Sequence, residues 1–226
     1  MRIAVLGTGM VGRTLAERLA ELGHEVTMGT RDIGQTLIRP LTGDTGSPLF
    51  SGWLTQVPAV RLALLGDAAA ESELIVNATS GGGTLSALGE VGEPNLAGKV
   101  LLDIANPLDF TNGFPPSLTV CNTDSLGEQV QRAFPSARVV KSLNTMNADL
   151  MARPWLIGAG EHSVFVCGDD PDAKSVVVAL LGNLGHRDII DLGGISSARG
   201  TEMFLALWTR TMGALGTAAF NVKVVR

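Results

Sequence analysis

The sequence of 226 residues has few of the features that mark several common protein classes. Its two cysteines, Cys121 and Cys167, lack metal-ligand spacing and indicate no disulfide framework, so we expect both to be small, buried apolar side chains. Lysine and arginine form no run and the net charge is −5, which disfavours a nucleic-acid partner. The three histidines lie far apart, and each is expected at the surface; no metal site is predicted.

The sequence also has no apolar stretch of the ~20 residues that a membrane-spanning helix needs. A strand is expected from Arg2 onward, which predicts that no signal peptide precedes it. Hydrophobic residues make up 45% and charged residues 17% of the chain, which is typical of a globular protein with ample core. We therefore expect a cytoplasmic protein without a membrane partner.

Residues 1–32 carry the strongest pattern in the sequence. The apolar run 2–6 predicts a buried strand and ends at Gly7, where a Gly-x-Gly-x-x-Gly motif begins. Apolar residues then recur at helical spacing, and a second strand is predicted over residues 25–28. This unit is typical of a Rossmann dinucleotide-binding domain.

Each glycine of the motif has a separate physical role. Gly7 permits the tight turn, Gly9 lets the backbone approach a pyrophosphate, and Gly12 lets the helix pack close to the strand. The pyrophosphate would lie on the free N–H groups at the start of the helix. The alternative is a merely structural glycine-rich turn. The cofactor contacts predicted here are Gly7, Thr8, Gly9, Met10, Val11 and Gly12.

The residues that end the second strand select the cofactor. NAD enzymes place an acidic residue about 20 residues after the glycine turn, where it holds the ribose 2′-hydroxyl. This sequence has Arg31 there, and a guanidinium can pair with a 2′-phosphate and stack on the adenine. Thr30 can donate a hydroxyl to the same phosphate, so NADP(H) is the predicted cofactor. In the alternative, Arg31 is a solvated surface residue and Asp32, one residue late, is the ribose acid.

Later strands are predicted to end at the same edge of the sheet as this turn. They cover residues 60–65, 74–78, 100–104 and 138–143. Ligands of open α/β sheets bind outside the carboxyl ends of the strands. The residues placed at the cofactor for this reason are Ala78, Thr79, Ser80, Asn106, Pro107 and Asn144.

Several of these residues have structural alternatives. Thr79 or Ser80 could cap a helix entered through three glycines, and Asn106 could cap a turn. Lys141, in the middle of the last of these strands, is interpreted as structural or as a solvated rim charge.

The predicted fold class is α/β, a doubly wound and mostly parallel Rossmann sheet with a small C-terminal α/β domain. Residues 1–150 form the NADP-binding domain, in which residues 30–60 are an insertion with a helix over 33–39 and then a loop containing Gly43. Residues 151–226 form the small domain, which is expected to complete the acceptor site and to offer a homodimer contact. In it, Ser196 is predicted to cap a long apolar helix, and the tail 220–225 to form an edge strand.

Five segments of the sequence resemble the coenzyme F420-dependent NADP oxidoreductases, also called NADPH:F420 reductases. They are VLGTGMVGRTLAERLAELGHEV, TRD, VVKSLNT, VFVCGDD and DLGGISSARGTEM, and they extend over nearly the whole chain. The resemblance implies a Rossmann domain for NADP, a small C-terminal domain and hydride transfer between the nicotinamide and a deazaflavin. It also implies phosphate-holding roles for Thr8, Thr30 and Arg31.

One position departs from the archaeal members of that family, which carry a histidine after the sixth strand, near the deazaflavin. This sequence has Asn144 there and so resembles a bacterial side branch, with F420 and a flavin both open as acceptor. No side chains suited to moving the proton of an alcohol are visible, and no catalytic residue is assigned. The predicted function is an NADP(H)-dependent oxidoreductase with an F420- or flavin-type acceptor. The alternatives are a non-catalytic NADP-binding redox sensor and a reductase of a small carbonyl compound.

Overall fold

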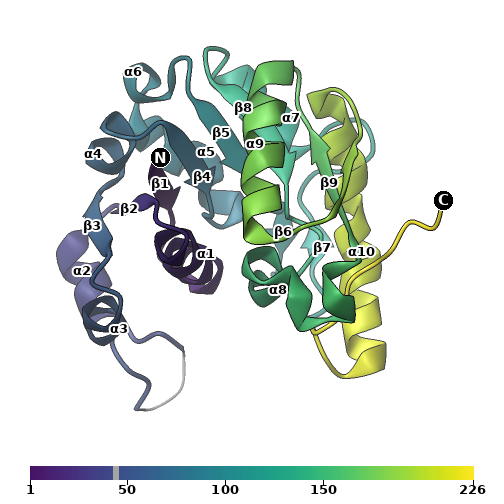
Figure 1. Cartoon of the computed structure of the whole chain (residues 1–226), viewed down its shortest axis with the longest axis horizontal. Coiled ribbons are helices and arrows are strands. Elements are labelled where there is room, and N and C mark those ends of the chain that lie inside the picture. Colours follow the sequence, from purple (N-terminus) through teal and green to yellow (C-terminus); the bar gives the residue numbers. More distant parts are fainter. Residues whose placement is uncertain (43–45) are drawn as a thin grey trace.

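The computed structural model describes residues 1–42 and 46–226, and its centre is an eight-stranded sheet (Figure 1). The strand order is β10-β9-β8-β5-β4-β1-β2-β3. The strands are β1 (Arg2–Leu6), β2 (Glu25–Thr30), β3 (Val60–Leu64), β4 (Leu74–Asn77), β5 (Val100–Asp103), β8 (Arg138–Ser142), β9 (Ser163–Cys167) and β10 (Asp188–Asp191). All neighbours run parallel except β8 and β9. The predicted α/β Rossmann class is confirmed.

Helices cover both faces of this sheet, so its central strands are buried on both sides. They are α1 (Met10–Glu21), α2 (Ile33–Ile38), α3 (Phe50–Gln56), α4 (Leu65–Ala70), α5 (Thr84–Val91), α6 (Glu93–Leu96), α7 (Leu126–Ala133), α8 (Ala148–Ala152), α9 (Pro171–Leu184) and α10 (Ala198–Leu215). Alternate residues of β1 show the two faces: Ile3 and Val5 pack with α1, α8 and α9, whereas Ala4 and Leu6 pack with α4, α5 and α7.

The order in which successive strands are added to the sheet reverses at β1, because β2 lies on one side of β1 and β4 lies on the other. In open α/β sheets such a switch point leaves a crevice at the carboxyl ends of the strands. The segments that follow β1, β2 and β4 therefore meet at this edge, and all three carry residues predicted to hold the cofactor.

The insertion after β2 is more ordered than the sequence analysis expected. Helix α2 agrees with the prediction, but α3 occupies part of the predicted loop, held by the fully buried ring of Phe50. A backbone bridge between Pro40 and Leu49 closes the segment between the two helices. Gly43, named in the loop prediction, lies outside the described residues.

The C-terminal part of the chain extends the same sheet. β9 pairs antiparallel with β8, and β10 pairs parallel with β9. The prediction that the tail 220–225 forms a strand is wrong; its backbone bonds β9 at Ser163, whose N–H donates to Val222 O (2.9 Å). The division of the chain at residue 150 stays a prediction.

The prediction for the start of the last helix was wrong in detail. Helix α10 begins after a 3-10 turn, η4 (Ile195–Ser197), so Ser196 is not its cap, and the Ser197 hydroxyl donates to Leu192 O instead (2.7 Å). The segment after β5 contains a small antiparallel pair, β6 (Leu108–Asp109) and β7 (Ser117–Leu118). None of the helices in the described residues has both the length and the apolar character that crossing a membrane requires.

Candidate functional site: a cleft at the switch point of the sheet

A cleft of about 370 Å³ opens at the carboxyl ends of β1, β2 and β4. Its lining residues are Gly7, Thr8, Gly9, Gly29, Thr30, Arg31, Asp32, Gln35, Thr36, Arg39, Leu65, Ala78, Thr79, Ser80, Gly83 and Ala87. Seven of these sixteen residues come from the glycine turn, the end of β2 and the two residues that follow it. The cleft therefore combines a backbone-lined floor with a wall of hydroxyl and guanidinium groups.

The glycine turn has the geometry that its motif predicts. Gly7 has φ +108°, and a Cβ there would lie 2.5 Å from Ala78 O. A Cβ on Gly12 would lie 2.0 Å from Gly7 O, so the first turn of α1 packs directly against the loop. Gly9 is different, because nothing lies within 4 Å of its Cβ position. That open space faces the cleft, so a phosphate group can approach the backbone there; the residues present fit a dinucleotide.

The end of β2 and the helix α2 that follows it present two hydroxyls and a guanidinium to the cleft. Thr30 Oγ1 and Thr36 Oγ1 lie 2.6 Å apart and both residues line the cleft. Asp32 Oδ1 accepts the Gln35 N–H (2.9 Å) and so caps α2. Arg31 is exposed and forms no hydrogen bond or ion pair with any described residue. The Asp32 carboxylate is therefore already engaged as a helix cap, whereas the neighbouring Arg31 guanidinium is available to a ligand.

Arg39, at the end of α2, was missed in the sequence analysis. Its Nη2 donates to Thr8 O (2.6 Å) and to Thr8 Oγ1 (2.8 Å), which ties α2 to the glycine turn. Its guanidinium also lies over the Phe50 ring, 6.0 Å from the centroid. Only its place on the helix that follows the cofactor-selecting strand could have indicated it.

Not every predicted cofactor residue lines the cleft. Those that do not are Met10, Val11, Gly12, Asn106, Pro107 and Asn144. The first three form the start of α1 behind the glycine turn. Asn106 and Asn144 bind each other: Asn106 Nδ2 donates to Asn144 O and Asn144 Nδ2 donates to Asn106 Oδ1, both at 2.9 Å. These two amides join the carboxyl ends of β5 and β8.

Three glycines after β4 form a short 3-10 helix, η1 (Gly81–Gly83). A Cβ on Gly81 would lie 2.0 Å from Asn106 O, so η1 and the segment after β5 are in backbone contact. The predicted capping of the following helix by Thr79 or Ser80 is wrong, since neither side chain caps η1 or α5. Thr79 Oγ1 instead lies 2.6 Å from Asn77 Oδ1.

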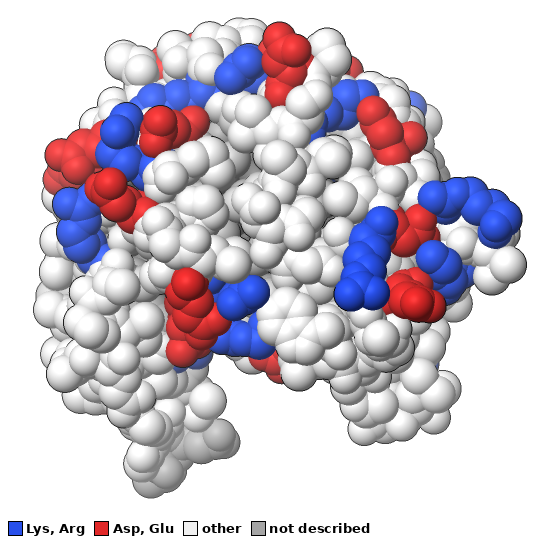
Figure 2. Space-filling model, viewed as in Figure 1, with Lys and Arg blue, Asp and Glu red and all other residues white. Residues whose placement is uncertain are grey.

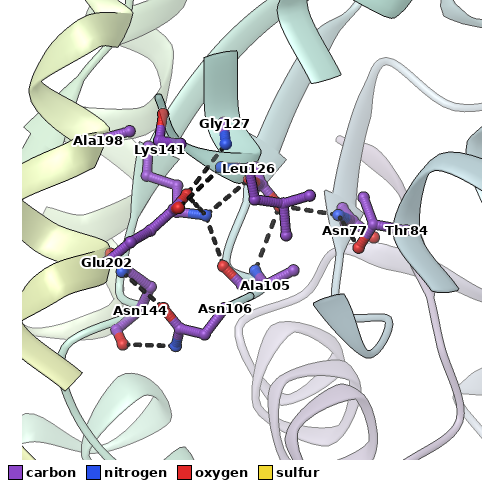
Figure 3. A network of polar contacts seen from close by, with 12 residues as sticks. Asn77, Thr84, Ala105, Asn106, Leu126, Gly127, Lys141, Asn144, Ala198 and Glu202 are labelled. Atoms are coloured by element: carbon purple, nitrogen blue, oxygen red, sulfur yellow. Dashed lines mark hydrogen bonds and ion pairs between the residues drawn. The ribbon is translucent and has the colours of Figure 1, made fainter. Parts of the chain in front are cut away.

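Behind this edge lies a buried ionic network (Figure 3). Lys141 Nζ lies 2.8 Å from Asp103 Oδ2 and 2.8 Å from Glu202 Oε1. The three side chains are at most 1% exposed, so the solvated-rim interpretation of Lys141 is wrong. Burial by itself lowers the pKa of the Lys141 ammonium, but the two carboxylates outweigh it and the pKa is raised.

The triad has two carboxylates and one ammonium, and hydrogen-bond donors stabilise its excess negative charge. Glu202 accepts the backbone N–H groups of Leu126 (2.8 Å) and Gly127 (3.0 Å) at the start of α7. Asp103 Oδ1 accepts from Asn77 Nδ2 (2.8 Å) and from the Ala105 N–H (3.2 Å). Contacts therefore run from the cleft residue Thr79 through Asn77 to α10. Asn77, Asp103 and Glu202 were missed in the sequence analysis.

Titratable side chains elsewhere stand apart from the cleft. His162 and His186 are buried, not at the surface as predicted, and burial lowers the pKa of His186 to about 4. Cys167 is buried as predicted, but Cys121 is exposed. Within the described residues no group of three or more His, Cys, Asp or Glu could hold a metal ion. Figure 2 shows acidic and basic side chains interspersed over one face of the molecule, without a patch of one sign.

The fold and the cleft define a Rossmann-type dinucleotide-binding protein. The family model described as NADP oxidoreductase, coenzyme F420-dependent, matches residues 2–107. A crystal structure of a candidate F420-dependent NADP reductase from Arthrobacter sp. FB24 is 59% identical, covers 100% of both chains and has a TM-score of 0.95. The chain belongs to this family of F420-dependent NADP oxidoreductases, and it is an NADP-dependent oxidoreductase.

More distant relatives differ in length. The F420-dependent NADP reductase of Methanocaldococcus jannaschii is 27% identical over 213 residues, which are 92% of this chain and 90% of that protein. The rat metalloreductase STEAP3 is 26% identical over 205 residues, or 89% of this chain. The chain spans only 36% of the length of that relative.

Proposed function

We propose that the protein transfers a hydride between NADPH and a deazaflavin (F420) or a flavin-type acceptor. The proposal is supported by the 59% identity to a candidate F420-dependent NADP reductase and by the side chains present in and beside the cleft. Among the described residues, the lining has hydroxyls and two arginines but no His, Lys, Cys or Glu, and its carboxylate, Asp32, caps α2. The residues proposed for the nicotinamide beyond the cleft, Asn106, Pro107 and Asn144, add none of these four residue types. Reduction of a carbonyl compound needs a positioned proton donor. Hydride transfer between two rings depends chiefly on their orientation.

The residues of this chain would then bind and orient rather than exchange protons. The glycine turn and the first N–H groups of α1 would hold the pyrophosphate, and Thr8, Thr30 and Arg31 the phosphate on the adenosine. Bound NADPH supplies the hydride from its nicotinamide. Thr79, Ser80, Asn106, Pro107 and Asn144 are proposed for the nicotinamide side. Lys141 is excluded as a proton donor there, because its ammonium is fully enclosed by Asp103, Glu202 and Ala105 O.

The test is NADPH oxidation, followed at the nicotinamide absorbance, with F420, FMN and a panel of aldehydes and ketones. We expect turnover with F420 or FMN and none with the carbonyl compounds. Turnover with a ketone alone would contradict the proposal, as would silence with every acceptor in a protein that binds NADPH tightly.

Cofactor choice has its own test in Arg31→Ala. We expect NADPH binding to weaken by on the order of 1.5–3 kcal/mol, the contribution of hydrogen bonds to a charged group, with NADH binding nearly unchanged. Calorimetry with both nucleotides measures this directly. Equal losses for the two would move Arg31 away from the phosphate.

We also propose a homodimer in the cytoplasm. The support for a dimer is the apolar surface of α10, where Leu207 and Leu215 are 61% and 57% exposed. The support for a reducing compartment is that Cys121 and Cys167 are both free. Light scattering on the wild type and on Leu207→Glu tests the first; an unchanged monomer mass for both would contradict it.

A further inference from the structure

We propose that Arg39 is a second specificity-determining residue for the cofactor, acting with Arg31 on the phosphate at the adenosine end. This inference rests on the proposal that the cofactor is NADP(H). Both arginines line the cleft, and they approach it from opposite ends of α2. The sequence pattern pointed only to the first of them.

Hydrogen bonds hold the Arg39 guanidinium in place, but they use only one of its three nitrogens. One nitrogen, Nη2, makes both bonds to Thr8, whose hydroxyl is itself placed to meet a phosphate oxygen. Within residues 1–42 and 46–226, Arg39 Nε and Nη1 have no protein acceptor. Two donor positions therefore remain for a ligand, in a plane already fixed by the contact to Thr8.

Positive charge is concentrated at this end of the cleft. Neither Arg31 nor Arg39 forms an ion pair with a carboxylate in the described part of the chain. Arg13, on α1, is close enough that burial and then the charge of Arg39 lower its pKa. Unpaired like charges in one place are unfavourable unless an anion joins them, and a phosphate monoester is the anion that paired arginines suit best.

The insertion between β2 and β3 fixes where Arg39 lies. The Phe50 N–H donates to Arg39 O (2.9 Å), and the Arg39 N–H donates to Thr36 O (3.2 Å). Below the guanidinium, the Phe50 ring is fully buried against the main core. Such prior ordering reduces the entropy lost on binding. The insertion thus holds Arg39 in the position from which it can contact the phosphate.

The chemistry of the cleft around Arg39 favours a dianionic ligand group. The hydroxyls of Thr8, Thr30 and Thr36 lie in the same lining, so neutral donors accompany the two cations. A ribose that lacks its phosphate offers no anion to either guanidinium. Arg39 should therefore affect the phosphorylated nucleotide selectively and contribute little to binding of the unphosphorylated one.

Calorimetry with NADPH, NADH, 2′,5′-ADP and AMP tests the inference on the full chain. The variants are Arg39→Ala, Arg39→Lys and Arg31→Ala, with Arg61→Ala as the matched control, since Arg61 is an exposed arginine on β3 that does not line the cleft. We expect Arg39→Ala to weaken NADPH and 2′,5′-ADP roughly 10- to 100-fold and to leave NADH and AMP within about twofold. Arg39→Lys should lie between the wild type and Arg39→Ala, and Arg61→Ala should match the wild type.

The outcomes separate this inference from the proposal beneath it. A wild type that binds no nucleotide, or prefers NADH, refutes the cofactor proposal and the inference together. A wild type that prefers NADPH, with Arg39→Ala unchanged, refutes the inference alone. Equal losses for NADPH and NADH in Arg39→Ala also refute it, because they assign Arg39 to the shape of the glycine turn. Because Arg39 is exposed, the melting temperature of Arg39→Ala should stay close to that of the wild type.

Discussion

The rings of His162 and His186 meet edge to face, with centroids 6.1 Å apart, in the buried region between α8 and β9. His186 Nε2 donates to Met151 O (3.1 Å), which leaves Nδ1 buried with no hydrogen-bond partner among the described residues. A proton added at Nδ1 would place a charge on a nitrogen that has neither solvent nor an acceptor. This relationship makes the fold sensitive to acid.

We predict that His186 destabilises the fold as the pH falls. Burial, and to a smaller extent the charge of His162, lowers the pKa of His186 to about 4, against 6.5 in the unfolded chain. Between these values the unfolded chain binds more protons, so the stabilising contribution is complete above pH 6.5 and is lost towards pH 4. The loss is roughly 3 kcal/mol at 1.36 kcal/mol per pH unit.

The measurement is the free energy of unfolding in urea at several pH values, for the wild type and for His186→Gln. The carboxylates titrate in both proteins, so the difference between the two curves isolates the histidine. It should change steadily between pH 6.5 and 4 and be flat above. Parallel curves throughout would refute the prediction.

The buried triad provides a second prediction. Lys141→Met leaves Asp103 and Glu202 as two buried carboxylates without a cation, and we expect a loss of about 3–5 kcal/mol in the free energy of unfolding. Lys141→Met combined with Glu202→Met should cost less than the sum of the single variants, because the charges are coupled. As a control, Arg61→Met breaks an exposed pair and should cost about 0–1 kcal/mol. Additive losses would show that the triad does not act as a unit.

The glycine turn separates folding from binding. Gly12→Ala places a Cβ against Gly7 O and should lower stability by at least about 2 kcal/mol. Gly9→Ala meets no atom within 4 Å and adopts an ordinary backbone, with φ −72°, so the fold should be unaffected. If the cofactor lies there, Gly9→Ala should nevertheless weaken NADPH binding. Thermal melts and calorimetry on both variants check this pair; a Gly9→Ala protein with normal NADPH affinity would place the pyrophosphate elsewhere.

The two cysteines should react at very different rates. Cys121 is exposed, whereas burial raises the pKa of the Cys167 thiol to about 12. With a chromogenic disulfide reagent at pH 8, we expect one thiol to react in the folded protein and the second only after denaturation. Cys121→Ser should abolish the first reaction and Cys167→Ser should leave it intact. Two equally fast thiols would contradict the burial of Cys167.

The parts of the fold predicted correctly are those with local causes. The strand 2–6 and the glycine motif specify a turn whose closest contact, that of Gly12 with Gly7 O, joins residues close in sequence. The helix predicted over 33–39 is also confirmed as α2, with Asp32 Oδ1 accepting the Gln35 N–H as its cap. In these segments periodicity and capping were sufficient.

The parts that were missed depend on partners distant in the chain. Lys141 lies in the apolar strand β8, and its buried position requires Glu202 from α10, which no local pattern connects to it. Its place inside an apolar strand was a signal that a carboxylate must be near. Arg39 was missed for a similar reason, since α1, β2 and α2 separate it in the chain from its partner Thr8.

The network in Figure 3 also limits how this chain can be recombined with its relatives. Its members come from β4, β5, α7, β8 and α10, so any crossover point between residues 103 and 202 separates partners. A chimera that takes α10 from a parent with an apolar residue in place of Glu202 would leave the N–H groups of Leu126 and Gly127 without their acceptor. Gene shuffling within this family should therefore retain these positions as one inherited set.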